Sequence, residues 1–191
     1  MRPIERIDYD HGNKILVLKP HTRLAEGFIK ASSEVAVMHR WPCGNGVDYG
    51  VVGRKSITYA FISMLAGTLA NNGTDPANIT NFKFHALGTG TTAEAATGAG
   101  AAIVNEVRGQ TGERVQGTQV LTLSSPNAAY RSVGVITFDD SVTGICEHAL
   151  YNFPTWGTNM DRTLWTGGDV FSVVSGSVVT VTYTSIWLSG G

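Results

Sequence analysis

The stretch "VVTVTYTSIWL", Val178 to Leu188, decides the fold class of this chain. Its residues alternate between two sets: Val179, Val181, Tyr183 and Trp187 form an apolar set, and Thr180, Thr182 and Thr184 form a polar one. Successive side chains of a β-strand point to opposite faces of the sheet. The period of two therefore predicts a strand with one buried face and one outer face.

Two earlier stretches follow the same pattern, "VQGTQVLTL" at 115–123 and "YRSVGVITF" at 130–138. Clusters of Gly, Asn, Pro, Asp and Ser separate these runs, as at 124–127, 139–141 and 156–159. Several short strands punctuated by turns are typical of an antiparallel sandwich. We expect a mainly β protein, an antiparallel β-sandwich of jelly-roll-like type.

One helix is predicted at 54–70, "RKSITYAFISMLAGTLA". Its apolar residues recur at spacings of three and four and would share one face: Ile57, Phe61, Met64, Leu65 and Leu69. Asn71, Asn72 and Gly73 supply the signal that ends it. A helix of this kind packs against the sheet, so residues 51–191 are expected to form the sandwich domain.

Residues 1–50 have little apolar mass of their own. Two short β-like runs, at 14–19 and 34–39, are separated by polar residues, glycines and prolines. We expect an extended N-terminal arm or hairpin that becomes fixed when it binds a partner through anchors such as Tyr9, Phe28 and Trp41. The alternative is a hairpin that completes the sandwich.

The composition excludes several functional classes. The 191 residues carry a formal net charge of −1, which offers no basic surface to nucleic acid. No apolar run reaches the about 18 residues that a membrane span requires. The first ten residues, "MRPIERIDYD", carry charges where a signal peptide needs an apolar run, so we expect a protein used without secretion.

The charge content also bears on partners. Only 15% of the residues are charged, whereas about 25% is typical of soluble domains. This indicates that much of the surface faces other protein. Cys43 and Cys146 have no metal-type spacing and are expected to be unpaired thiols, and no cofactor is expected.

One glycine-rich motif deserves comparison with nucleotide-binding loops. The segment Gly88 to Ala93 spells G-x-G-x-x-A after a β-like run. A dinucleotide site would need a helix opening on this motif and a parallel crossover after it. The following residues are small and interrupted by Gly98 and Gly100. We therefore expect a structural turn, with tight packing around the glycines.

A second motif, Cys146-Glu147-His148, contains a thiol, a carboxylate and an imidazole. On a strand the first and third residues would share one face and Glu147 would take the other. Nothing nearby in the sequence completes a catalytic triad or a metal site, and the five histidines are scattered. We expect no catalytic residues and no metal ligands, although an enzyme built on these residues is an alternative hypothesis.

Two arginines are candidate partner contacts. Arg108 and Arg114 flank a glycine-containing turn and could present guanidinium groups to another protein, or could be solvated loop residues. A separate candidate is a sugar-binding site, for which Trp156, Trp165, Asn159 and Asp161 offer aromatic faces and polar groups.

A series of blocks, in order, resembles tailed-bacteriophage accessory virion proteins. The blocks are "FHALGTGTTAEAATGAGAAIVNEV" from residue 84, Gly117-Thr118-Gln119, "VITF" from 135, "EHALYN" from 147, "DRTLW" from 161 and the closing "VVTVTYTSIWLSGG". The resemblance covers roughly residues 82–191. Ala149-Leu150-Tyr151 and Leu164-Trp165 depart mildly from the blocks usual in these proteins.

The resemblance implies a non-enzymatic structural role in the virion. The first expectation is a capsid cement (decoration) protein on the capsid surface, whose partners are the major capsid protein and further copies of itself, arranged as a trimer. The alternative is a tail or baseplate module, which could bind a host glycan.

Overall fold

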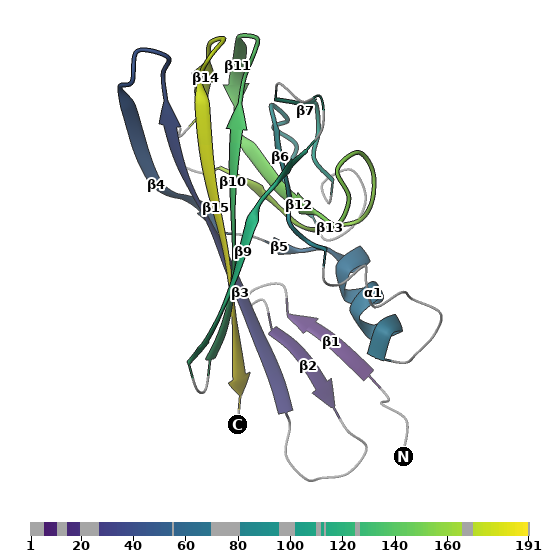
Figure 1. Ribbon diagram of the computed structural model, residues 1–191. Coiled ribbons are helices and arrows are strands. Elements are labelled where there is room, and N and C mark those ends of the chain that lie inside the picture. The colour runs from purple at the N-terminus through teal and green to yellow at the C-terminus, as the bar shows by residue number, and fades with distance from the viewer. Residues whose placement is uncertain are drawn as a thin grey trace.

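The computed structural model describes residues 6–10, 15–19, 27–54, 56–69, 81–95, 102–109, 112, 114–124, 127–165 and 170–190. For residues up to 32 and from 188 onward it describes the backbone alone. Within these ranges the chain is mainly β, with antiparallel sheets packed together and one short helix (Figure 1). The predicted fold class is confirmed.

The larger sheet has seven strands in the order β1-β2-β3-β15-β10-β9, with β4 also paired to β3. The strand bounds are β1 Arg6–Asp10, β2 Ile15–Lys19, β3 Gly27–Arg40, β4 Gly46–Arg54, β9 Thr118–Ser124, β10 Asn127–Thr137 and β15 Val178–Gly190. The strand that decided the fold class, β15, lies between β3 and β10 and pairs with both along its length (Figure 1).

A second sheet of six strands packs on the first. Its order is β5-β13-β12-β6-β7, with β8 also paired to β6. The bounds are β5 Ser56–Ile57, β6 Phe84–Gly88, β7 Glu106–Val107, β8 Val115–Gln116, β12 Glu147–Tyr151 and β13 Asn159–Leu164. A two-stranded sheet joins β11 Val142–Ile145 to β14 Phe171–Val173.

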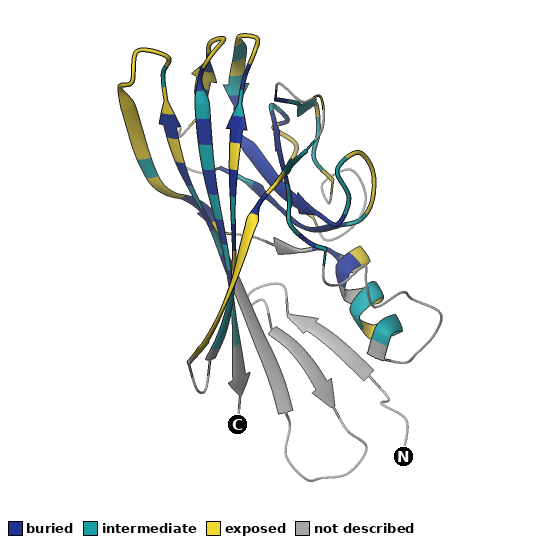
Figure 2. Cartoon of the chain, in the orientation of Figure 1, coloured by how far each residue is buried: buried dark blue, intermediate teal, exposed yellow. Residues whose placement is uncertain are grey.

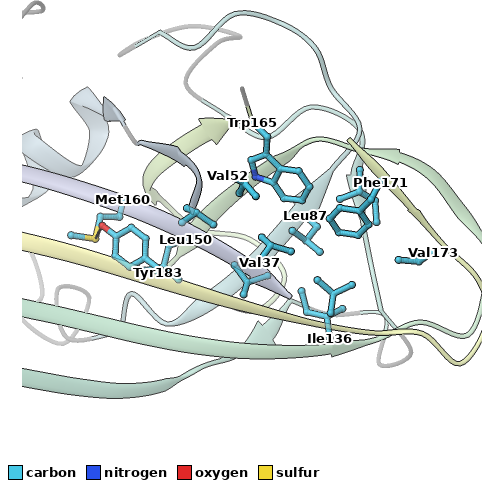
Figure 3. Packing of buried hydrophobic residues seen from close by; sticks show 14 of the residues in the cluster. Val37, Val52, Leu87, Ile136, Leu150, Met160, Trp165, Phe171, Val173 and Tyr183 are labelled. Atoms are coloured by element: carbon cyan, nitrogen blue, oxygen red, sulfur yellow. Dashed lines mark hydrogen bonds between the residues drawn. The ribbon is translucent and has the colours of Figure 1, made fainter. Parts of the chain in front are cut away.

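The core between the sheets follows from the period of two. Val179, Val181 and Tyr183 of β15 are fully buried, and the threonines between them lie on the opposite face. All three belong to the core cluster that includes Leu150 and Met160 of the second sheet, and Figure 3 shows Tyr183 beside Met160. The Tyr183 hydroxyl donates to Met160 Sδ over 3.5 Å, so the two layers are joined by polar as well as apolar contacts.

The helix is shorter than the sequence predicted. α1 spans Tyr59–Leu69, because β4 continues to Arg54 and Ser56–Ile57 pair with β13. The Thr58 hydroxyl accepts a hydrogen bond from the Phe61 amide over 3.2 Å, so it caps the helix N-terminus. Phe61 packs edge-on against Phe82, with ring centroids 5.2 Å apart, which anchors the helix on the core as expected.

The described part of the first 50 residues belongs to the large sheet. β3 is an interior strand, paired with β15 on one side and with β2 and β4 on the other. The predicted boundary at residue 50 falls inside β4. From residue 27 onward, β3 and β4 form an antiparallel hairpin within the large sheet. Val35 and Val37 of β3 are buried against the second sheet. Their burial explains why the short apolar run at 34–39 is enough to hold β3 in the large sheet.

Candidate functional site

The glycine-rich loop after β6 surrounds a buried carboxylate. Glu147, on β12, is fully buried, and its Oε1 accepts hydrogen bonds from the amides of Gly90 over 2.8 Å and of Val104 over 2.9 Å. Its Oε2 accepts from Arg162 Nε on β13 over 2.6 Å. Arg162 in turn donates to the carbonyl oxygen of Thr92 over 2.9 Å. The loop therefore binds both partners of the ion pair: the Gly90 amide binds Glu147, and the Thr92 carbonyl oxygen binds Arg162.

This arrangement explains the nucleotide-like motif. A dinucleotide loop offers its backbone amides to a phosphate, whereas here an internal carboxylate occupies one of them. The absence of a side chain is required, because a Cβ on Gly90 would lie 2.7 Å from Glu147 Oε1. The expected structural turn is what the geometry supports.

The Cys146-Glu147-His148 motif does not form one chemical unit. Cys146 Sγ donates to the carbonyl oxygen of Gly90 over 3.3 Å, and Glu147 binds Arg162. His148 instead turns to His85, with 3.0 Å between its Nε2 and His85 Nδ1. Burial, and then the charge of Glu147, raise the pKa of the Cys146 thiol, which disfavours the nucleophilic thiolate.

The two histidines belong to a buried polar row that the sequence did not indicate. His85 Nε2 lies 2.8 Å from Ser132 Oγ, so Ser132, His85 and His148 form a connected series across the sandwich. A hydroxyl next to an imidazole can act as a nucleophile. All three residues are at most 1% exposed, so a substrate cannot reach this hydroxyl. The row joins β10 of one sheet to β6 and β12 of the other and acts as a structural link.

The two candidate arginines bind within the chain. Arg114 makes a bidentate ion pair with Glu106, at 2.8 and 3.0 Å, and its guanidinium carbon lies 3.4 Å from the ring centre of Tyr151. Its side chain is only 7% exposed. Arg108 also reaches Glu106, over 3.3 Å, and donates to the Pro154 carbonyl oxygen. Arg114 therefore has little guanidinium surface left for a partner.

The same arginine organises the loop at 152–158. Its Nη1 donates to the carbonyl oxygens of Phe153 over 3.2 Å and of Trp156 over 2.8 Å. The Trp156 ring stacks on Phe153 at 4.0 Å between centroids and is 64% exposed. The loop therefore presents one aromatic face to solvent from a fixed base.

The rest of the predicted sugar site is not assembled. Trp165 lies in the core, stacked on Phe171 with 5.2 Å between ring centroids. Asn159 and Asp161 are buried on β13. Of the four residues in that candidate site, Trp156 alone is exposed.

The aromatic anchors of the first 50 residues are described unequally. Trp41 is half-buried in the turn between β3 and β4, where its ring lies 4.6 Å from that of His39. Tyr9 is on β1 and Phe28 on β3, and both side chains lie outside the described part of the structure.

Exposed apolar side chains occur on the face of the large sheet turned away from the core, which we call the outer face. Met38, Thr180 and Val135 are neighbours in register across β3, β15 and β10, and Val51 of β4 lies opposite Ala36. Met38, Val51 and Val135 are 41%, 53% and 51% exposed. These values are high for side chains of this kind within a sheet.

Searches for other sites and for relatives gave three findings. Among the described residues, no three or more His, Cys, Asp or Glu side chains are grouped as a metal site would require. No helix of this part of the chain has the length and apolarity needed to cross a membrane. No family model, curated protein or solved structure matches the chain.

Proposed function

We propose that the protein is a non-enzymatic structural component of a virion, a cement protein that stabilises the shell of the major capsid protein from the capsid surface. One observation carries the proposal: the candidate catalytic side chains at 146–148 and Ser132 are buried and hydrogen-bonded within the chain, while apolar side chains are exposed on a broad sheet. The resemblance of residues 82–191 to phage accessory virion proteins supports the same role.

The outer face suits a large partner. Its exposed apolar residues are spread over several strands, and the threonines of β15 lie between them. Exposed apolar patches rimmed by polar groups mark protein interaction sites. The same face also carries exposed charged side chains around the apolar ones, such as Arg40, Asp48 and Arg131.

A cement protein must also resist deformation under load. The sandwich has two sheets joined by a dense core and by the row of Ser132, His85 and His148. The Glu147–Arg162 ion pair links two neighbouring strands of the second sheet. Close-packed interiors have low compressibility and transmit strain. A block of this kind transmits force between the capsid subunits that it contacts.

Co-sedimentation with assembled empty capsids tests the proposal. The wild-type protein is expected to sediment with the capsids, and Val135→Lys, which places a charge on the outer face, is expected to weaken binding at least tenfold. Val174→Lys is the matched control, because Val174 is 47% exposed but lies outside the large sheet. Wild-type protein that stays in the supernatant would contradict the role, and equal binding by the Val135→Lys variant would contradict the outer face.

A tail or baseplate module that binds a glycan is the second candidate. The exposed ring of Trp156, held by Phe153 and Arg114, favours it, because a fixed aromatic face suits a sugar ring. A glycan array separates the two roles. Binding that is lost in Trp156→Ala would support the glycan module, whereas an array without binding, together with capsid co-sedimentation, would support the cement protein.

A further inference from the structure

The strand at one edge of the large sheet, β9, exposes its side chains on both faces. In the described part of the chain β9 pairs with β10 alone, so its other edge has no strand beside it. Every described side chain of β9 is exposed, as Figure 2 shows. Leu121 and Leu123 are 65% and 75% exposed. These are the largest exposures among the described apolar side chains of the sheet.

The other edges of this sheet, β1 and β4, carry features that prevent pairing with a strand of another molecule. β4 has a charged residue, Asp48, whose carboxylate accepts a hydrogen bond from the Gly50 amide over 2.8 Å, and its register with β3 shifts twice. Gly50 has a φ of 62°, which distorts the strand further. β1 reads "RIDYD", with three charges in five residues. Charges and bulges of this kind block edge-to-edge pairing.

β9 reads "TQVLTLS" and contains no charge, no proline and no glycine. Its register with β10 is regular from Thr118 to Ser124. Uncharged strands of high β propensity at a free edge are templates for pairing with another strand. The contrast with β1 and β4 indicates that this edge is open to a partner.

The pattern along β9 describes the strand that would fit. Leu121 lies opposite Tyr130, and Leu123 lies opposite Ala128, which in turn pairs with Trp187. The two leucines therefore continue the apolar face of the sheet. Val120 and Thr122 lie on the other face. A matching strand needs alternate leucines on one face and small β-formers on the other, which is the sequence of β9 itself.

We propose that β9 pairs antiparallel with β9 of a second copy of this chain, around a two-fold axis, so that two large sheets become one continuous sheet. Since β9 carries no charge, no like charges meet across the axis. A register centred on Thr122 places Leu121 of each copy opposite Leu123 of the other, and cross-strand apolar pairs stabilise a sheet. A two-fold contact covers the β9 edges of both copies at once, so neither β9 edge is left free.

This inference goes beyond the capsid role and does not depend on it. The contact uses the edge of the sheet and leaves its outer face uncovered. It makes the dimer the basic unit, whereas the trimer expected from the resemblance would need a different contact.

Light scattering after size exclusion, over a range of protein concentrations, is the first test. The wild-type chain is expected to be a dimer, and Leu121→Lys, which places two charges at the axis, a monomer over the same range. Val174→Lys is the control and should remain a dimer. Far-ultraviolet circular dichroism should be unchanged in all three proteins, because Leu121 is exposed.

Disulfide trapping is the second test. The background is Cys43→Ser, since Cys43 is exposed and Cys146 is buried. Under mild oxidation, Thr122→Cys is expected to give a covalent dimer in high yield if the register is centred there, and Leu121→Cys if it is centred one residue earlier. Val174→Cys should remain monomeric on a non-reducing gel.

Three results would overturn the inference: a wild-type monomer at every concentration, a trimer or dimer that Leu121→Lys does not change, or the absence of trapping at both positions. A monomer whose binding to capsids is lost in Leu121→Lys would assign the edge to a capsid strand instead. The capsid role fails separately, if a dimer trapped at β9 does not sediment with capsids.

Discussion

Glu147 and Arg162 form the ion pair that organises the candidate site. Both side chains are at most 1% exposed, and their charges are compensated by each other and by the backbone of the glycine-rich loop. Burying a charge is costly unless it is paired and hydrogen-bonded. The ion pair is therefore suited to fixing the position of the loop rather than to acid–base or nucleophilic catalysis.

Removal of one charge is expected to destabilise the fold. Glu147→Gln breaks the buried ion pair with Arg162, which should lower the free energy of unfolding by about 3–5 kcal/mol. Urea unfolding followed by tryptophan fluorescence measures this change. The control is Glu34→Gln, which breaks the surface pair with Arg54 and should cost less than about 1 kcal/mol. Equal effects of the two substitutions would contradict the structural role of Glu147.

His39 is expected to make the stability of the fold depend on pH. Its ring is fully buried between Trp41 and Phe171, and burial lowers its pKa from the usual value. The unfolded chain then binds more protons than the folded chain below a pH of about 6.5, so stability is lost as the pH falls through this range. The expected result is a free energy of unfolding that decreases from pH 7 to pH 5 in urea titrations.

The variant His39→Phe isolates this contribution, because it keeps an aromatic ring between Trp41 and Phe171 and removes the titrating group. Its decrease in stability between pH 7 and pH 5 should be smaller than that of the wild-type protein. The same decrease in both proteins would assign the pH dependence to other groups.

At the scale of the elements, the glycine-rich loop at 88–93, which we call the strap, crosses the neighbouring strands β12 and β13 of the second sheet and binds a side chain of each. It follows β6, passes over the Glu147 carboxylate on β12 and reaches Arg162 on β13 through Thr92. The loop thus connects three neighbouring strands without being part of any ladder. Its glycines allow this close approach.

A side chain added within the strap should weaken it. Gly90→Ala places a Cβ 2.7 Å from Glu147 Oε1, too close for either group to keep its position. Overpacking of this kind costs about 1–3 kcal/mol, which should lower the melting temperature in calorimetry. Thr91→Ala is the control in the same loop, because Thr91 is exposed, and should leave the melting temperature unchanged. A Gly90→Ala variant as stable as wild type would contradict the strap.

The sequence predicted those elements whose signal is local. The alternation in β15 and β10 was sufficient to predict their strands and their buried faces, because a period of two is written in consecutive residues. The predicted helix starts at residue 54, five residues before α1. The sequence before Thr58 fits a helix equally well, and only the pairing of Ser56 and Ile57 with β13 holds it in the extended conformation of a strand. The interior position of β3 depends on β15, which lies far away in the sequence.

The site shows the same limit. The motif at Gly88 to Ala93 could be recognised from the sequence, and the lack of a following helix and parallel crossover favoured a structural turn over a dinucleotide loop. The carboxylate that takes the place of the phosphate could not be assigned, because Glu147 comes from a distant strand. Ser132 gave no signal at all, since a serine on an alternating strand is unremarkable until His85 is placed beside it.

At the scale of the whole molecule, the protein is a sandwich with two very different surfaces. The core lies between the inner faces of the two sheets, and the Glu147–Arg162 pair lies under the glycine-rich loop. The outer face and the β9 edge of the large sheet expose apolar side chains. Such a distribution suits a protein that binds other proteins over a broad area. We propose that the outer face binds the capsid shell and that the β9 edge binds a second copy of this chain.

The central claim, that the protein is a shell component, is tested most directly by its copy number in purified virions. Quantitative mass spectrometry of particles, with the major capsid protein as the internal standard, gives the ratio of the two chains. A cement protein should be present at a fixed ratio to the major capsid protein, with a copy number close to that of the capsid protein. A copy number of only a few per particle, or none, would contradict the claim.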